Sequence, residues 1–215
     1  DNNLVQLHDL KIPNQKVPMH TKEERARLQK AFGYTYEDLK TSILPMALNG
    51  SESIGAMGID TPLAVLSNKH QPLFNYFKQL FAQVTNPPID SIREKVVTST
   101  TVYLGTDGNV LEEKAENCKQ LKINDPILTN TDLLKIKNMK VDGFKVETIP
   151  IIYYKNTSLE KAIDHLFVEV DRAHREGANI IILSDRGVDE NHVAIPSLLA
   201  VSALQQYLVQ TKKRT

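Results

Sequence analysis

The run TSLEKAIDHLFVEVDRAHREGANIIILS, residues 157–184, predicts a helix followed by a buried strand. Apolar residues from Leu159 to Ala173 recur at intervals of three and four, which is the stripe of an amphipathic helix. The pair Thr157 and Glu160 has the pattern of a capping box, and Gly177 suits the end of the helix. The run NIIILS is continuously apolar, as in a parallel strand that is covered on both faces.

The flanking segments extend this pattern to strand, helix, strand, helix. Residues 146–154 are rich in β-branched and aromatic side chains and predict a strand. Ile195 and Pro196 begin a last helix that runs to about Gln210. Such units are parallel and right-handed. We therefore expect an α/β domain with a mostly parallel sheet and flanking helices, and consider an incomplete or irregular (β/α) barrel as its form.

The rest of the chain is organised less clearly. Residues 1–20 carry no period and are interpreted as an entry strap or linker, and residues 21–215 as a single α/β domain. The predicted elements between the strap and residue 146 are a capped helix from Thr21 to Gly33, a helix after Thr35 that ends at Asn49–Gly50, a helix from Pro62 to a stop at Asn86–Pro88, a strand over 96–104, a surface excursion over 112–125 and a helix over 131–138.

Composition limits the function. The 215 residues include 26 basic and 26 acidic side chains, so the formal net charge is zero and a nucleic-acid role is not expected. The run Lys212–Arg214 is interpreted as a solvated helix end. A single cysteine, Cys118, cannot form an internal disulfide or hold an iron–sulfur cluster alone, which favours a reducing, cytoplasmic compartment. No apolar run approaches the roughly 20 residues of a membrane span, so no membrane role is expected.

No residue set predicts chemistry of its own. Gly55–Gly58 lacks the third glycine of a dinucleotide fingerprint and is interpreted as a tight turn. Phe77 and Phe81 lie at helical spacing among leucines and are expected in a core rather than as a flavin platform. The six histidines show no metal-ligand spacing, and Cys118 has no nearby histidine, so neither a metal site nor a catalytic residue is expected.

The loop after the NIIILS strand leaves two interpretations open. It holds Asp185, Arg186, Asp189, Glu190 and His192, and binding groups in α/β folds follow the carboxyl ends of strands. The planar fork of Arg186 could bind a small anion. The other interpretation is a solvated loop with a local Asp185–Arg186 pair.

Several blocks resemble one family over nearly the full chain. They are GAMGIDTPLAVLS (55–67), YFKQLFAQVTNPPID (76–90), GTDGNVL (105–111), DPILTNTDLLKI (125–136), IIILSDRG (180–187) and IPSLLAVSALQQYL (195–208). Together and in this order they resemble the central domain of the glutamine-dependent glutamate synthase large subunit. The first 20 residues match least distinctly.

The resemblance implies a non-catalytic module of a multidomain oxidoreductase that acts on CH–NH2 donors. In that family an amidotransferase domain releases ammonia from glutamine, and a domain with FMN and an iron–sulfur cluster uses it to aminate 2-oxoglutarate. The central domain links the two and helps to wall an ammonia tunnel, in glutamate biosynthesis and nitrogen assimilation. By resemblance, the amidotransferase and FMN-binding domains of the same polypeptide are the partners, and this chain has no cofactor of its own.

The resemblance also implies site residues. A tunnel wall needs small neutral side chains and hydroxyls, because a carboxylate would hold ammonia as ammonium. The tunnel-lining candidates are Met57, Gly58, Ile59, Thr61 and Pro62, with Thr61 as a gate. Candidates for domain junctions are Thr85, Asn86, Asp185 and Arg186. The alternatives are a freestanding α/β protein that binds a small anionic ligand at the 185–192 loop and a small independent flavin oxidoreductase.

Overall fold

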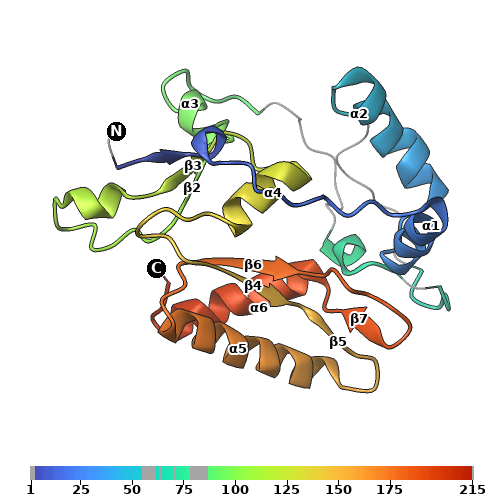
Figure 1. Cartoon of the computed structure of the whole chain (residues 1–215). Coiled ribbons are helices and arrows are strands. Elements are labelled where there is room, and N and C mark those ends of the chain that lie inside the picture. Colours follow the sequence, from blue (N-terminus) through green and yellow to red (C-terminus); the bar gives the residue numbers. More distant parts are fainter. Residues whose placement is uncertain (1–2, 55–61, 63, 70, 78–86, 215) are drawn as a thin grey trace. The chain divides into compact units, whose positions relative to one another are not determined.

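The computed structural model describes residues 3–54, 62, 64–69, 71–77 and 87–214. The chain divides into two compact units (Figure 1). One unit combines Asp1–Val17 with Ser91–Thr215, and the other is Pro18–Asp90. The larger unit holds the sheets and the buried core, and it positions the candidate residues Asp185 and Arg186.

A parallel strand pair is the centre of the larger unit. β4 (Val146–Pro150) pairs in parallel with β6 (Ile180–Ser184), with Val146 opposite Ile180 and Pro150 opposite Ser184. The crossover between them is α5 (Leu159–Arg175), as the run of residues 157–184 predicts. Only Ile180 of β6 is buried and the other four residues are half-buried, so complete burial of this strand was a wrong prediction.

The predicted strand over 146–154 is divided in two by Ile151. Its second part, β5 (Ile152–Tyr154), pairs antiparallel with β7 (His192–Ala194). Ile151 lies where the parallel pairing changes to antiparallel pairing. Its N–H donates to Ser184 O, and its carbonyl accepts from Ile195 N. The sheets are therefore only partly parallel, and the described strands form no closed barrel.

Helices α5 and α6 (Ser197–Gln210) cover one face of the β4–β6 pair (Figure 1). The predicted stripe of α5 is confirmed, because Ala162, Leu166, Val170 and Ala173 are its buried residues. The cap is one residue later than predicted. Ser158, not Thr157, is the N-cap and accepts from Lys161 N, so no glutamate completes a capping box here.

The other face of the pair packs against a second sheet and α4 (Asn130–Lys137). This sheet has the order β1–β3–β2, with β1 (Val5–Gln6) parallel and β2 (Val102–Leu104) antiparallel to β3 (Leu121–Ile123). Leu121 and Ile123 are buried together with Ile136 and Ile180. The shared core explains why two short sheets and one helix are held together in this unit.

Three sequence predictions for this region need correction. The segment 112–125 is not only a surface excursion, because it ends in β3, the central strand of its sheet. The predicted strand over 96–104 begins with a helical turn, α3 (Glu94–Val97), and only β2 is extended. The predicted helix over 131–138 starts one residue earlier, at Asn130, where Thr129 and Asp132 form a capping box. Short 3₁₀ turns occupy Leu7–Asp9 and Ala115–Cys118.

The smaller unit is built from locally capped helices. α1 (Lys22–Ala31) has the predicted capping box of Thr21 and Glu24, and Gly33 follows it at a φ of +78°. The second predicted helix is a π-helical stretch, Asp38–Ile43, that continues into α2 (Leu44–Asn49) and ends at Gly50.

The long helix predicted from Pro62 is wrong where the structure describes it. Pro62 and residues 64–69 are not helical, and Leu73–Phe77 form a 3₁₀ turn. The expected core position of Phe77 is also wrong, because 73% of its surface is exposed. Phe81 lies outside the described residues.

Within the described part of the chain, no helix has the length and apolar character needed to cross a membrane.

The alternation of burial along α5 gives a matched stability test. Val170 is fully buried and Val168 on the same helix is 60% exposed. We expect Val170→Ala to lower the free energy of unfolding by roughly 2–3 kcal/mol, since two buried methyl groups and their contacts are lost. Val168→Ala should change it by less than about 0.5 kcal/mol. Urea unfolding of both variants measures this, and equal losses would contradict the assigned core face.

Candidate functional site

The β6–β7 loop is shaped by the Asp189 carboxylate. Its Oδ1 accepts from the backbone N–H groups of Asn191 at 2.7 Å and His192 at 2.8 Å, and the His192 Nδ1 lies 2.9 Å away. These backbone bonds, Asn191 first, and the His192 ring hold the pKa of Asp189 below its usual value. The carboxylate is therefore an internal cap of the loop, which leaves it less able to bind a ligand.

Two further contacts fix the conformation of this loop. The His192 ring lies edge-on to Tyr154 with 6.1 Å between ring centroids. Gly187 has a φ of +103°, and a Cβ there would lie 3.0 Å from Ile152 Cδ1. The positive φ favours glycine at this position, so the path of the loop after β6 is defined by its own sequence.

Arg186 and Asp185 do not form the local pair considered from the sequence. Arg186 Nη2 instead donates to Asn130 Oδ1 at 3.2 Å, which connects the loop to the first residue of α4. Asp185 is half-buried, and the described residues include no ion pair to it. The Asp185 carboxylate and the exposed Arg186 guanidinium are therefore adjacent in the sequence, and both follow the carboxyl end of β6.

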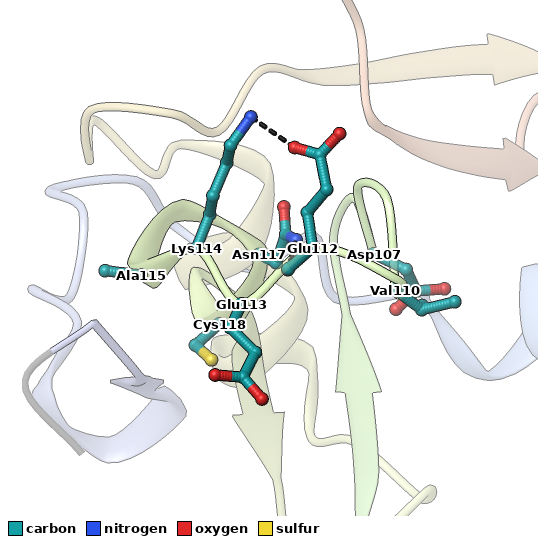
Figure 2. Close-up of a pocket in the computed structure, with 8 residues that line it drawn as sticks. All are labelled: Asp107, Val110, Glu112, Glu113, Lys114, Ala115, Asn117 and Cys118. Atoms are coloured by element: carbon teal, nitrogen blue, oxygen red, sulfur yellow. Dashed lines mark hydrogen bonds and ion pairs between the residues drawn. The ribbon is translucent and has the colours of Figure 1, made fainter.

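A shallow hollow lies in the connection between β2 and β3 (Figure 2). Its volume is about 540 Å3, and Figure 2 shows Lys114 turned toward Glu112, with which it forms an ion pair. The lining residues are Asp107, Val110, Glu112, Glu113, Lys114, Ala115, Asn117 and Cys118.

The hollow is acidic, and its described lining holds no cysteine–histidine pair. It holds three carboxylates against one lysine, and no histidine is among its described lining residues. Asn117 is used structurally, since its Nδ2 donates to the carbonyls of Asn109 at 2.7 Å and Glu112 at 2.8 Å. The exposed thiol of Cys118 therefore has no histidine beside it among these lining residues.

A polar clamp between α5 and α6 was not predicted. Asp171 accepts a hydrogen bond from the Tyr207 hydroxyl at 2.7 Å and forms an ion pair with Lys213. The Tyr207 ring stacks on Phe167 at 4.2 Å between centroids, and Lys213 Nζ lies 5.1 Å from the Tyr207 ring centroid. The interpretation of the terminal basic run as a solvated helix end is therefore wrong for Lys213.

The charges of the clamp support one another. Lys213 and then Tyr207 lower the pKa of Asp171, and Asp171 raises the pKa of both Lys213 and Tyr207. A hollow of about 240 Å3 beside it is lined by Val168, Asp171, Arg175 and Lys213. No local signal marks this clamp, because its partners are 36 and 42 residues apart in the sequence.

Most residues predicted for the tunnel and one junction lie outside the described residues. These are Met57, Gly58, Ile59, Thr61, Thr85 and Asn86. Pro62 is described and exposed, as are Pro87 to Asp90 at the end of the TNPPID block. The structure therefore brings together Asp185 and Arg186 only, on the β6–β7 loop.

In the ranges that the structure describes, no three histidine, cysteine, aspartate or glutamate side chains are grouped so as to hold a metal ion.

Comparison with known proteins gives one consistent result. The glutamate synthase central domain model matches residues 27–215. The glutamate synthase (NADPH) large chain of Bacillus subtilis is 44% identical over 187 residues, which are 87% of this chain and 12% of that protein. The glutamate synthase (NADH) of Schizosaccharomyces pombe is 42% identical over 86% of this chain and 9% of its own length.

A third relative is named for its dependence on ferredoxin. The ferredoxin-dependent glutamate synthase 2 of Synechocystis is 44% identical over 86% of this chain and 12% of its own length. The chain thus spans only about a tenth of the length of the curated relatives that it matches.

The clamp predicts a pH dependence of stability. Because the pKa of Asp171 is lowered in the folded state, its contribution is present above its unfolded value of 3.8 and is lost as the pH falls through the lower folded value. We expect Asp171→Asn to have a lower melting temperature than the wild type at pH 7, and this difference to shrink below about pH 4.

Asp164→Asn is the matched control, since Asp164 is an exposed aspartate on the same helix. Its melting temperature should stay close to that of the wild type from pH 7 to pH 3. Calorimetry over this range measures all three proteins. A difference between the wild type and Asp171→Asn that is constant with pH would contradict the role of the charged clamp.

Proposed function

This chain belongs to the glutamate synthase central-domain family, and we propose that it is the non-catalytic module that links a glutaminase domain to an FMN and iron–sulfur synthase domain. The observation that carries the proposal is the family match over residues 27–215 together with the small share of each relative that the chain covers.

The proposed enzyme is an oxidoreductase that makes glutamate from glutamine and 2-oxoglutarate in nitrogen assimilation. The single Cys118 cannot supply the several thiolates of an iron–sulfur cluster, so the cluster and FMN are assigned to the neighbouring domain. The relative named for NADPH and the relative named for ferredoxin are each 44% identical to this chain. The electron donor is therefore proposed to be selected outside this domain.

Ammonia is proposed to pass along the segment that holds Met57, Gly58, Ile59, Thr61 and Pro62. Their side chains are neutral and mostly small, and Asp60 is the one charge between Met57 and Ala64. Such a wall does not stabilise ammonium, so ammonia would stay neutral and mobile between the two sites. Thr61 is proposed as the gate, because a hydroxyl can both donate and accept a hydrogen bond.

The junctions with the neighbouring domains are proposed to involve Thr85, Asn86, Asp185 and Arg186. Support for the last two comes from their place on a loop whose path is fixed by Asp189 and Gly187. A rigid loop with an exposed guanidinium can form a charge-assisted contact at low entropic cost. An irregular (β/α) barrel is also proposed for the complete domain, and a cytoplasmic location is proposed because the single cysteine favours a reducing compartment.

The alternative, a freestanding protein that binds an anion at the 185–192 loop, has less support. The loop carries Asp185, Asp189 and Glu190 beside Arg186, and these carboxylates would repel a small anion. No described feature favours an independent flavin oxidoreductase.

Blocking the proposed gate should uncouple the two reactions. In the full-length synthase we expect Thr61→Trp to consume more glutamine than 2-oxoglutarate, because ammonia that cannot pass the bulky ring escapes to solvent. The wild type should consume the two substrates one to one. Thr157→Trp, an exposed threonine before α5, is the control and should remain coupled. A one-to-one ratio in Thr61→Trp would show that Thr61 is not the gate.

Removing the proposed junction cation should loosen the domains. We expect Arg186→Ala to make the full-length synthase more sensitive to limited proteolysis between domains and to lower its rate of glutamate formation. Arg27→Ala removes the same side chain from an exposed position on α1 and serves as the control. If both variants resisted proteolysis and kept the wild-type rate, Arg186 would not be a junction residue.

A further inference from the structure

Among the described residues, strand β6 has backbone hydrogen-bond partners along one edge only. Ile180 N donates to Lys145 O at 3.2 Å, and Ile151 N donates to Ser184 O at 2.8 Å, so the even-numbered residues of β6 face β4. In a parallel ladder the residues between them direct N–H and C=O to the opposite edge. For Ile181 and Leu183, the described residues supply no backbone partner at that edge.

Both faces of this open edge are nevertheless covered. The side chains of Ile181 and Leu183 pack into the core with α5 and α6, while Ile180 and Ile182 pack with Leu121 and Ile136 on the other face. Parallel sheets covered on both faces are normally several strands wide, and a pair of strands is marginal alone. The layers of this unit therefore fit a wider sheet than the two strands that they enclose.

The two outer edges of the pair differ in chemistry. On β4 the outward positions are Val146, Thr148 and Pro150, and Pro150 has no N–H to offer another strand. Proline at such a position is typical of a strand that ends a sheet. β6 carries neither a proline nor a charge from Ile180 to Leu183. The outer edge of β4 is therefore less suited to a further strand than the outer edge of β6.

We infer that the open edge of β6 takes a further β-strand from the same synthase polypeptide, outside this chain. The occupant follows from length, because the chain covers 9% to 12% of its relatives and the rest of the polypeptide is available in cis. The layers on both faces require a strand that is apolar on both sides. This inference rests on the proposed function in one respect, namely that the chain is part of a full-length synthase.

Hydrogen exchange in the wild-type full-length synthase tests the inference with an internal control. The backbone N–H of Ile182 points to β4 and should exchange slowly whether or not the edge is occupied. The N–H groups of Ile181 and Leu183 point to the open edge. If a strand occupies that edge, all three amides should exchange at rates within about tenfold of one another. Mass spectrometry with electron-transfer fragmentation resolves the three positions.

An alternating pattern, with Ile181 and Leu183 exchanging roughly 100-fold or more faster than Ile182, would overturn the inference. Protection of Ile181 and Leu183 that disappears on dilution would assign the edge to a second copy and would also overturn it. The ratio of glutamine to 2-oxoglutarate consumed, measured on the same preparation, reports on the linking function separately. A coupled enzyme with an alternating pattern would retain the proposed function and lose only the additional strand.

Discussion

The parallel pairing of Val146–Pro150 with Ile180–Ser184 is the constraint on which the larger unit depends. Parallel strands joined by a crossover helix are usually covered on both faces, because their side chains are apolar on both sides of the sheet. Helices α5 and α6 cover one face, and α4 with β3 covers the other. The short strands β1 and β2 are positioned by their pairing with β3. The loop after β6 begins at Ser184, where the parallel pairing ends.

The smaller unit follows a different principle. None of its described residues is buried, and its helices are stabilised by local caps such as Thr21 with Glu24 and Thr35 with Asp38. It also exposes many large apolar side chains, among them Tyr36, Leu48 and Ile54. Exposed apolar surface of this kind is typical of a segment that meets other protein surfaces. That character agrees with a module of a larger polypeptide, whereas a freestanding protein would leave this surface in water.

The sequence predicted elements whose signals are local. The stripe of α5, the capping box of α1 and the strand β6 follow from periodicity and turn chemistry over a few residues, and the structure confirms them. β3 was missed because Leu121 and Ile123 are only two apolar residues beside a charged segment, and their burial comes from partners far along the chain. The clamp on Asp171 was missed for the same reason. The family resemblance, confirmed by the comparisons, came from whole blocks of sequence, while the roles of single residues such as Thr61 remain predictions.

The central claim is that this chain is a connecting module and has no separate existence as an enzyme. The most direct measurement is the size of the natural polypeptide that contains it, by immunoblot of the source cells with an antibody raised against the chain. We expect one band many times larger than 24.2 kDa, the mass of these 215 residues. A band at 24.2 kDa would contradict a connecting role, because a freestanding chain would have no glutaminase or synthase domain to connect.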